Sequence, residues 1–216
     1  MKYKLVAFDL DGTLADGTDS VWATLHEFFC LKNHPRRLEL REKFWSGKIN
    51  YRRWAIEDLK LLKEHGANKE TVMKAIASIR LMKGARETLK QLKAYGCRLA
   101  IVSGSFQIVL EKVMPDYKRF FDYVYISRIF FNVDGSIKGI EAKHDFKNKS
   151  KSLVEIFRKE KIKSEDCVFV GDHDNDVEIA KTAGLSIAFN SKSEKLNAVC
   201  DAVIRKKDLR EILKFL

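Results

Sequence analysis

Two carboxylates separated by one residue, Asp9 and Asp11, follow a short apolar run near the N-terminus. The run over residues 5–8 is predicted to be a buried parallel strand, and the two-residue period of a strand points both carboxylates to the same side. Crowded carboxylates are costly unless a cation or hydrogen-bond donors compensate them. In open α/β sheets, ligands bind at this end of the strands. The pattern favours a ligand site over the alternative of a turn or helix cap.

Polar residues also follow two later apolar runs. Ser103 and Gly104 come directly after one predicted strand, and Asp172 comes shortly after another. Asp9 with Asp172 makes an oxygen site suited to Mg²⁺, which prefers one or two carboxylates together with water and phosphate oxygens. Such a cation would relieve the repulsion between the carboxylates and keep Asp9 ionised and nucleophilic.

The chemistry that these groups suit is phosphoryl transfer. The Ser103 hydroxyl, backbone N–H groups and Lys149 would hold phosphate oxygens and neutralise their charge. Asp11, two residues from the nucleophile, could protonate the leaving group and then activate water. Asn175 and Asp176 belong to the polar segment that follows the last of these strands, and they are expected at the same edge of the sheet.

Helical patterns alone occupy the segment between residues 15 and 80. Apolar residues at helical spacing predict one helix from Val21, capped by Thr18, Asp19 or Ser20. Three more helices are predicted, over residues 35–45, from residue 51 and over residues 68–79. All three tryptophans lie in this segment. We expect them to pack a small helical core, and the alternative is that they line a substrate pocket.

From residue 83 onward, predicted strands alternate with helices, as in a parallel sheet covered on both faces. The predicted strands cover residues 98–102, 123–126, 167–170, 185–189 and 202–204. The predicted helices cover residues 85–94, 106–114 and 149–160. Of two further predicted helices, one ends at residue 183 and the other follows residue 208. Residues 130–140 alternate about an Asp-Gly turn and predict a β-hairpin. The predicted fold is α/β: a Rossmann-like core domain of residues 1–14 and 81–216, with a helical cap domain of residues 15–80 and a β-hairpin flap.

The bulk composition excludes several classes of protein. The chain has 216 residues, of which 45% are hydrophobic, and this suits one core domain with an insertion. No apolar run reaches about 18 residues and no signal-peptide pattern opens the chain, so we expect no membrane span and a cytoplasmic location. The four cysteines are widely spaced, and three of them are predicted to be buried free thiols.

The formal net charge of +11 has two interpretations. A basic patch favours nucleic-acid binding, but here the Lys and Arg residues are scattered and often lie near Glu or Asp. We therefore expect no nucleic-acid partner. A positive field also favours an anionic substrate, such as a small phosphorylated metabolite. The sequence is compatible with a monomer and with a homodimer.

Four motifs occur in an order that resembles the haloacid dehalogenase-like (HAD) phosphatases over nearly the whole chain. The first motif is Asp9-Leu10-Asp11-Gly12-Thr13, the second is Ser103-Gly104, and the fourth is Gly171-Asp172-His173-Asp174-Asn175-Asp176. Lys149 matches the third motif, because it lies 23 residues before Asp172. Lys147 and Lys151 are the alternatives, and Lys149 is preferred for its spacing.

The resemblance implies a role for each matched residue. Asp9 would be the nucleophile that forms an aspartyl-phosphate, and Asp11 the general acid and base. Mg²⁺ would be held by Asp9, the Asp11 carbonyl and Asp172, with Asp176 as support or as a further ligand. The residues expected to bind the substrate phosphate are Ser103, Gly104, Lys149 and Asn175.

Within this family, the chain is most similar to the phosphoserine phosphatases, which share the helical cap and the hairpin. Two positions depart from that pattern: the cap glutamate that contacts the substrate amine falls on Thr18, and the cap arginine that holds the substrate carboxylate falls on Asp58. Asp19, Arg52 and Arg53 are the possible replacements. Aromatic residues at the cap suggest a more apolar pocket. We therefore expect another small phosphorylated metabolite as the substrate, with phosphoserine itself as the alternative.

Two other functions are weaker alternatives. A receiver-type signalling domain also uses an aspartate, Mg²⁺, a Ser or Thr and a Lys, but it lacks an insertion after the first strand and leaves Asp11 without a role. A nucleic-acid-binding protein on a degenerate phosphatase scaffold is disfavoured because every expected catalytic position is filled.

Overall fold

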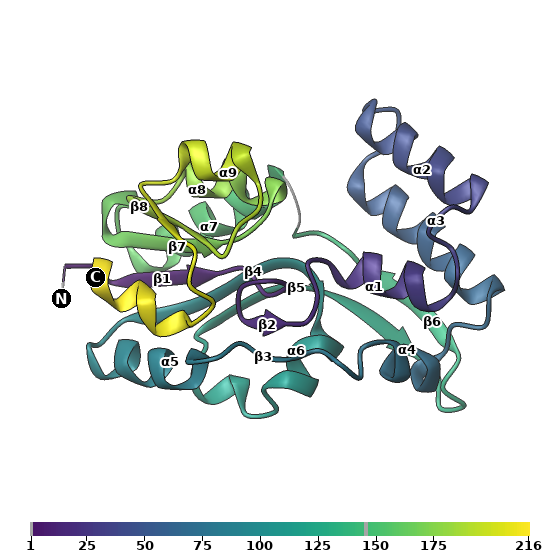
Figure 1. The fold of residues 1–216 in the computed structure, drawn as a ribbon, viewed down its shortest axis with the longest axis horizontal. Helices are drawn as coiled ribbons and strands as arrows, with labels where there is room; N and C mark the ends of the chain where they lie inside the picture. Colours follow the sequence, from purple (N-terminus) through teal and green to yellow (C-terminus); the bar gives the residue numbers. More distant parts are fainter. Residues whose placement is uncertain (1, 145–146) are drawn as a thin grey trace.

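The computed structural model describes residues 2–144 and 147–216, which build a seven-stranded sheet and a two-stranded sheet (Figure 1). The strands of the large sheet are β1 (Leu5–Phe8), β4 (Arg98–Phe106), β5 (Tyr123–Phe131), β6 (Ile137–Glu141), β7 (Cys167–Gly171), β8 (Leu185–Phe189) and β9 (Ala202–Ile204). The small sheet pairs β2 (Ala15–Asp16) with β3 (Arg80–Leu81).

The helices of the described chain are of two kinds. The α-helices are α1 (Val21–Phe28), α2 (Pro35–Trp45), α3 (Tyr51–Glu64), α4 (Lys69–Ala75), α5 (Ala85–Ala94), α6 (Gln107–Val113), α7 (Lys147–Glu160), α8 (Val177–Ala180) and α9 (Glu194–Val199). The 3₁₀ helices are η1 (Tyr117–Arg119), η2 (Ser164–Asp166), η3 (Asp174–Asp176) and η4 (Leu209–Phe215). No helix of the described ranges combines the length and apolar character that crossing a membrane requires.

The order of the large sheet is β6-β5-β4-β1-β7-β8-β9, which places the first strand in the middle. All neighbouring pairs are parallel except β5 and β6, which form the antiparallel hairpin. Phe8 at the end of β1 lies opposite Ile101 of β4 and Val170 of β7. The residues that follow these three strands therefore come together at one edge, and the α/β prediction is confirmed.

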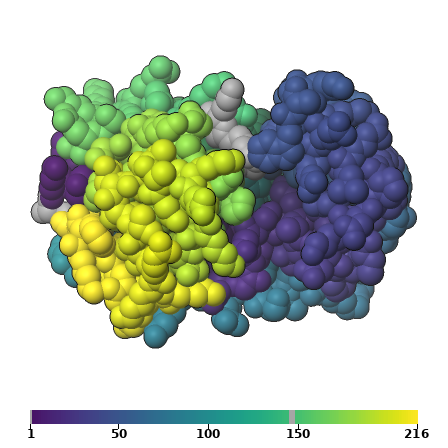
Figure 2. All heavy atoms as spheres, turned by 45° about the horizontal axis from the view of Figure 1, so that its top comes forward, coloured from purple at the N-terminus to yellow at the C-terminus, as the bar shows by residue number. Residues whose placement is uncertain are grey.

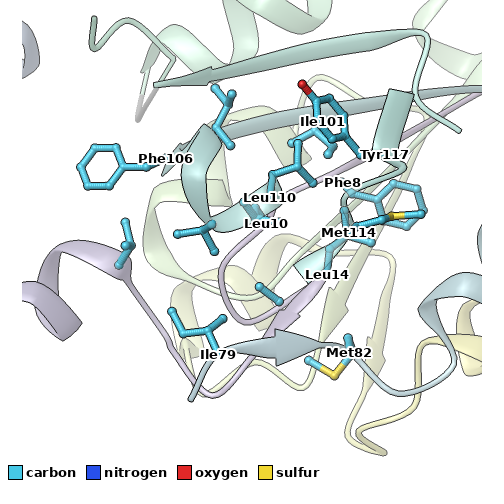
Figure 3. Close-up of a cluster of buried hydrophobic side chains, with 14 of the residues drawn as sticks. Phe8, Leu10, Leu14, Ile79, Met82, Ile101, Phe106, Leu110, Met114 and Tyr117 are labelled. Carbon is cyan, nitrogen blue, oxygen red and sulfur yellow. The ribbon is translucent and has the colours of Figure 1, made fainter. Parts of the chain in front are cut away.

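The two faces of the sheet bury different side chains of β1. Leu5 and Ala7 pack toward the layer of α7, α8 and α9, whereas Val6 and Phe8 pack toward the layer of α5 and α6 (Figure 1). Figure 3 shows Phe8 in this second layer, among side chains from α6 and from the loop after β1. Because all four residues are fully buried, the strand is apolar without alternation, as expected of a parallel strand covered on both faces.

The helices α1 to α4 are inserted between β2 and β3 and form a lobe beside the core, drawn in purple to blue in Figure 2. Asn68 caps α4 through a capping box with Thr71. The backbone N–H of Lys69 donates to the carbonyl of Gly135 at 2.8 Å, and Asn68 bridges to Ser136. The inserted helices are therefore bonded to the tip of the β5–β6 hairpin.

Several element boundaries differ from the prediction. The helix expected over residues 68–79 ends at Ala75, because the chain must turn there to enter β3 while it keeps Ile76 and Ile79 buried. The strand expected to end at residue 102 continues to Phe106, with an irregularity in its pairing with β5. The helix expected to end at residue 183 is a 3₁₀ turn followed by α8, which ends at Ala180.

The short elements β2, β3, α9, η1 and η2 were not predicted, because two to six residues are too few to show a periodic pattern. Three of the cysteines were predicted to be buried free thiols, and all four are free. Cys97 and Cys167 are buried and Cys200 is half-buried, whereas Cys30 is exposed.

Asp208 anchors the C-terminal segment. Its carboxylate accepts hydrogen bonds from the backbone N–H of Arg210 at 3.2 Å and from its Nε at 2.8 Å, and this interaction holds the pKa of Asp208 well below its usual range. We expect Asp208→Asn to lower the free energy of unfolding by about 1 kcal/mol at neutral pH. Because the pKa of Asp208 is lower in the folded state than in the unfolded state, its carboxylate stabilises the fold at pH values above the unfolded-state pKa. The difference in free energy of unfolding between the two proteins should therefore shrink below about pH 4. Denaturant unfolding on both sides of this pH measures it, and an equal difference at both would contradict the assignment.

Candidate active site

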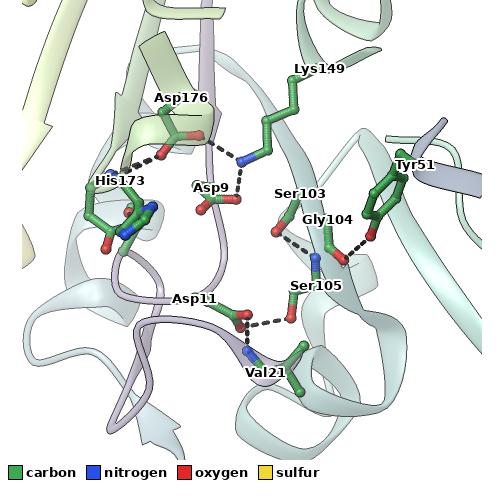
Figure 4. A network of polar contacts seen from close by, with 12 residues as sticks. Asp9, Asp11, Val21, Tyr51, Ser103, Gly104, Ser105, Lys149, His173 and Asp176 are labelled. Carbon is green, nitrogen blue, oxygen red and sulfur yellow. Dashed lines mark hydrogen bonds and ion pairs between the residues drawn. The ribbon is translucent and has the colours of Figure 1, made fainter. Parts of the chain in front are cut away.

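The predicted site residues meet at the carboxyl edge of the three central strands. Asp9 follows β1 and Ser103 lies on β4 (Figure 4). Asp172 follows β7. The backbone N–H of Asp9 donates to the carbonyl of Val170 at 2.9 Å, which holds the first turn after β1 against β7. All three polar side chains are buried. The topology alone thus gathers groups that are far apart in the sequence.

Asp9, Asp172 and Asp176 form a buried carboxylate cluster, with one ligand oxygen of each within 4.8 Å of the others. Burial, together with the charge of Asp9, raises the pKa of Asp176 to about 7 and raises that of Asp172 well above its usual value. Three carboxylates facing one ammonium carry an excess of negative charge. A cluster of hard oxygen donors with this excess fits a divalent cation such as Mg²⁺.

Lys149 supplies the ammonium of this cluster. Its Nζ lies 2.9 Å from Asp9 Oδ1 and 2.6 Å from Asp176 Oδ1, and its side chain has no exposed surface (Figure 4). Lys149 lies in the first turn of α7. Of the two alternatives for this position, Lys151 is exposed, and the side chain of Lys147 lies outside the described part of the chain.

Asp11 does not join the carboxylate cluster. Its Oδ1 accepts a hydrogen bond from the Ser105 hydroxyl and its Oδ2 accepts one from the backbone N–H of Val21, both at 2.7 Å. Burial raises the pKa of Asp11 to about 7 even though both hydrogen bonds lower it. A carboxyl group with this pKa can donate a proton and accept one near neutral pH, which is what a general acid and base requires.

The cap of α1 was predicted to be Thr18, Asp19 or Ser20. Ser20 does hold the N-cap position, but its side chain makes no capping hydrogen bond. The first N–H of the helix donates to Asp11 instead, so the loop after β1 performs the capping. This contact places the start of α1 directly over the site.

Ser105 is a site residue that the sequence interpretation missed. It orients Asp11, and its backbone N–H donates to Ser103 Oγ at 3.1 Å. Its position two residues after Ser103 in a strand could have indicated it, because such residues share a face. The carbonyl of Gly104 accepts a hydrogen bond from the Tyr51 hydroxyl at 3.2 Å, which links α3 to β4. Thr13 donates to Asp172 Oδ1 at 3.3 Å.

A cavity of about 340 Å³ lies over this edge, within the size range of small-molecule sites. Its floor includes five of the predicted residues, Asp9, Asp11, Ser103, Gly104 and Asn175. Lys149, Asp172 and Asp176 lie behind the floor and do not line it. The opposite wall comes from the inserted helices. All three tryptophans line the cavity. Trp22 is also buried in the core and Trp54 packs against it, as expected, whereas Trp45 is exposed.

Neither position at which the sequence departs from the phosphoserine phosphatase pattern lines this cavity. The Thr18 hydroxyl pairs with the Thr24 hydroxyl at 2.8 Å. Asp58 has no exposed surface, and its Oδ2 lies 2.6 Å from Nε2 of His26. His26 lines the cavity in its place.

Gly12 is required by the close approach of Asp172. Its φ is +73°, and a Cβ built on it would lie 2.1 Å from Asp172 Oδ2. We expect Gly12→Ala to reduce turnover by about 100-fold or more and to destabilise the fold by about 2 kcal/mol. Gly47→Ala is the matched control, because Gly47 has a φ of +75° and no atom within 4 Å of such a Cβ. Both variants carry the backbone strain, so equal activity in the two would show that the contact with Asp172 is unimportant.

Known proteins match this arrangement along the whole chain. The sequence profile of the haloacid dehalogenase-like hydrolases matches residues 3–184. The phosphoserine phosphatase of Methanocaldococcus jannaschii is 35% identical, and the match covers 100% of this chain and 98% of the relative. The phosphoserine phosphatase of Archaeoglobus fulgidus is 32% identical over 95% of this chain and 58% of that protein.

Solved structures match in the same way. A phospho-aspartyl intermediate analogue of phosphoserine phosphatase superposes with a TM-score of 0.76 at 33% identity and covers both chains completely. A substrate-bound phosphoserine phosphatase complex also gives 0.76, at 32% identity, and covers 100% of this chain and 99% of that one. The chain therefore belongs to the haloacid dehalogenase-like hydrolases and, among them, to the phosphatases of the phosphoserine phosphatase family.

Proposed function

We propose that the protein hydrolyses phosphate monoesters of a small metabolite in a Mg²⁺-dependent reaction with an aspartyl-phosphate intermediate on Asp9. One observation carries the proposal. Among the residues that the structure describes, Asp9 is the only member of the carboxylate cluster that also lines the cavity. Its carboxylate thus faces a bound substrate on one side and the cation site on the other.

In the proposed first step, an oxygen of Asp9 attacks the phosphorus, and the bond from phosphorus to the ester oxygen breaks. Asp11 gives its proton to the leaving alkoxide. In the second step, Asp11 takes a proton from water, and the resulting hydroxide attacks the phosphorus. The acyl phosphate bond then breaks, which releases inorganic phosphate and restores Asp9. The pKa of Asp11, raised to about 7 by burial, supports both proton transfers.

The remaining site residues would bind the cation, orient Asp9 and bind the substrate phosphate. Mg²⁺ would be held by Asp9, the Asp11 carbonyl and Asp172, with Asp176 in support, and when bound it would supply positive charge against the phosphoryl oxygens. Lys149 keeps Asp9 oriented through the 2.9 Å contact. Ser103, the backbone of Gly104 and Asn175 line the cavity and would bind the substrate phosphate, whereas Lys149, which was also expected to bind it, does not line the cavity and would act through Asp9.

We also propose the division into a core of residues 1–14 and 81–216 and a cap of residues 15–80. The pairing of β2 with β3 supports it, because the chain leaves the core and returns to it there. The cap would close the cavity over a bound substrate and exclude water.

Phosphoserine is a second candidate for the substrate, because the named relatives are phosphoserine phosphatases. Against it, neither Thr18 nor Asp58 lines the cavity. Other replacements do not fill the role: Arg52 and Arg53 do not line the cavity, and the Asp19 side chain is 72% exposed at its rim.

Phosphate release from L-phosphoserine and from p-nitrophenyl phosphate, with Mg²⁺ and with EDTA, tests the proposal. We expect EDTA to reduce turnover by at least about 100-fold and Mg²⁺ to restore it. Efficient turnover of phosphoserine, well above that of the generic ester, would establish the second candidate. Turnover that EDTA leaves unchanged would overturn the metal-dependent mechanism.

A further inference from the structure

The wall of the cavity opposite Asp9 carries two arginines. Arg37 and Arg41 lie four residues apart on α2, so they share one face of that helix, and both line the cavity. The α2 helix lies far from the sheet edge in Figure 1. The cavity therefore has the carboxylate chemistry at one end and two guanidinium groups at the other.

These guanidinium groups lack the carboxylate partners that their neighbour has. Arg36 pairs with Glu64 at 2.7 Å and with Glu57 at 3.7 Å. Within residues 2–144 and 147–216, no carboxylate lies within 4.0 Å of the guanidinium of Arg37 or Arg41. Arg37 donates one hydrogen bond, to the carbonyl of Lys32, which fixes its side chain and leaves further N–H groups for a ligand.

The acidic groups near this wall are already engaged elsewhere. Asp58 is buried and faces His26. Asp19 lies at the rim near Lys192, 3.6 Å away, and Asp174 is bonded to Ser193 and to Lys195. Asp58 attracts the charge of Arg37 but, among the described residues, forms no ion pair with it, so the two guanidinium groups keep a net positive charge and an anion between them would relieve their mutual repulsion.

Aromatic rings lie between the two charged ends. Trp54 packs against Trp22 with ring centroids 4.8 Å apart and against Phe44 at 5.9 Å, and all three line the cavity. A ligand that extends from Asp9 to α2 must cross this surface. An apolar body would bury favourably there, whereas a polar one would lose its water without hydrogen-bond partners.

We propose that Arg37 and Arg41 form a distal anion subsite, and that the substrate is a phosphate monoester whose second anionic group, a carboxylate in the simplest case, lies across an apolar body from the phosphate. The inference rests on the proposed phosphatase function and names its substrate class. A guanidinium group binds a carboxylate through two parallel hydrogen bonds, which would give the subsite both affinity and geometric specificity.

Binding of non-hydrolysable phosphonates tests the subsite separately from turnover. The probes are phenylphosphonate and its para-carboxy, para-carboxymethyl and para-carboxyethyl derivatives, titrated calorimetrically into the Mg²⁺-loaded protein. We expect at least one carboxylated probe to bind about tenfold or more tightly than phenylphosphonate. In the double variant Arg37→Gln/Arg41→Gln, this preference should fall to about one.

Arg36→Gln is the matched control on the same helix, because Arg36 does not line the cavity, and it should keep the preference. Arg41→Gln alone, at an exposed position, serves if the double variant fails to fold, and it should lose part of the preference. Equal binding of all four probes would overturn the inference, as would a preference that survives loss of both arginines. Mg²⁺-dependent turnover of p-nitrophenyl phosphate reports on the phosphatase function independently, so the two can fail separately.

Discussion

Asp9→Asn is expected to abolish phosphate release, with a loss of about 10⁴-fold or more in turnover. The amide has nearly the shape of the carboxylate but cannot attack phosphorus. Its oxygen can still accept the hydrogen bond that Lys149 Nζ donates to Asp9 Oδ1 at 2.9 Å, so the surrounding network should persist. Steady-state turnover measures the loss, and circular dichroism checks that the fold is unchanged.

Asp19→Asn is the control for this experiment, because Asp19 is an acid at the cavity rim with a largely exposed side chain. It should retain turnover within about threefold of the wild-type value. Rapid acid quench with a radiolabelled substrate should trap label on the wild-type protein and none on Asp9→Asn. Retained label on that variant would show that the nucleophile is another residue.

Lys149→Met is expected to have the second largest effect, and on stability as well as on turnover. The side chain of Lys149 is fully buried between Asp9 and Asp176, so its loss leaves three buried carboxylates without a counter-charge. Removing one partner of a buried ion pair costs about 3–5 kcal/mol, and we expect a loss of that order in the metal-free protein. Denaturant unfolding in EDTA measures it.

Mg²⁺ should stabilise Lys149→Met more than it stabilises the wild-type protein. Without the ammonium the carboxylate cluster is more negative, so a divalent cation that binds only the folded state binds it more tightly. Lys151→Met is the matched control, since Lys151 lies on the same helix but is exposed. An equal Mg²⁺ effect in all three proteins would place the cation away from this cluster.

The fold and the centre of the site could be predicted because their signals are local and strong. Each of the strands β1, β4 and β7 is an apolar run, and the polar groups Asp9, Ser103 and Asp172 stand at or near the ends of those runs. Parallel neighbours share one carboxyl edge, so convergence follows from the strand order alone. Lys149 was chosen on spacing, and its burial beside Asp9 agrees with that choice.

The residues that the sequence did not reveal depend on contacts between distant segments. Ser105 binds Asp11 across 94 residues of chain, and Asp58 binds His26 across 32. No pattern within either segment specifies such a partner. Arg37 and Arg41 belong to a helix with polar residues on several sides, and only the placement of α2 over the cavity distinguishes them from other surface arginines.

Several bonds between the inserted helices and the core limit how those helices can move. The β2–β3 pair and the bond from Lys69 at the start of α4 to Gly135 in the hairpin turn lie away from the cavity, whereas the bonds from Val21 to Asp11 and from Tyr51 to Gly104 lie at the site. A rotation about the line that joins the first two attachments would have to break the last two. Spin labels on α2 and α5 would record its amplitude as a change in their separation. A ligand held by Asp9 at one end and by α2 at the other spans the core and the inserted helices. Binding of its second anionic group would therefore be coupled to closure of the inserted helices over the cavity.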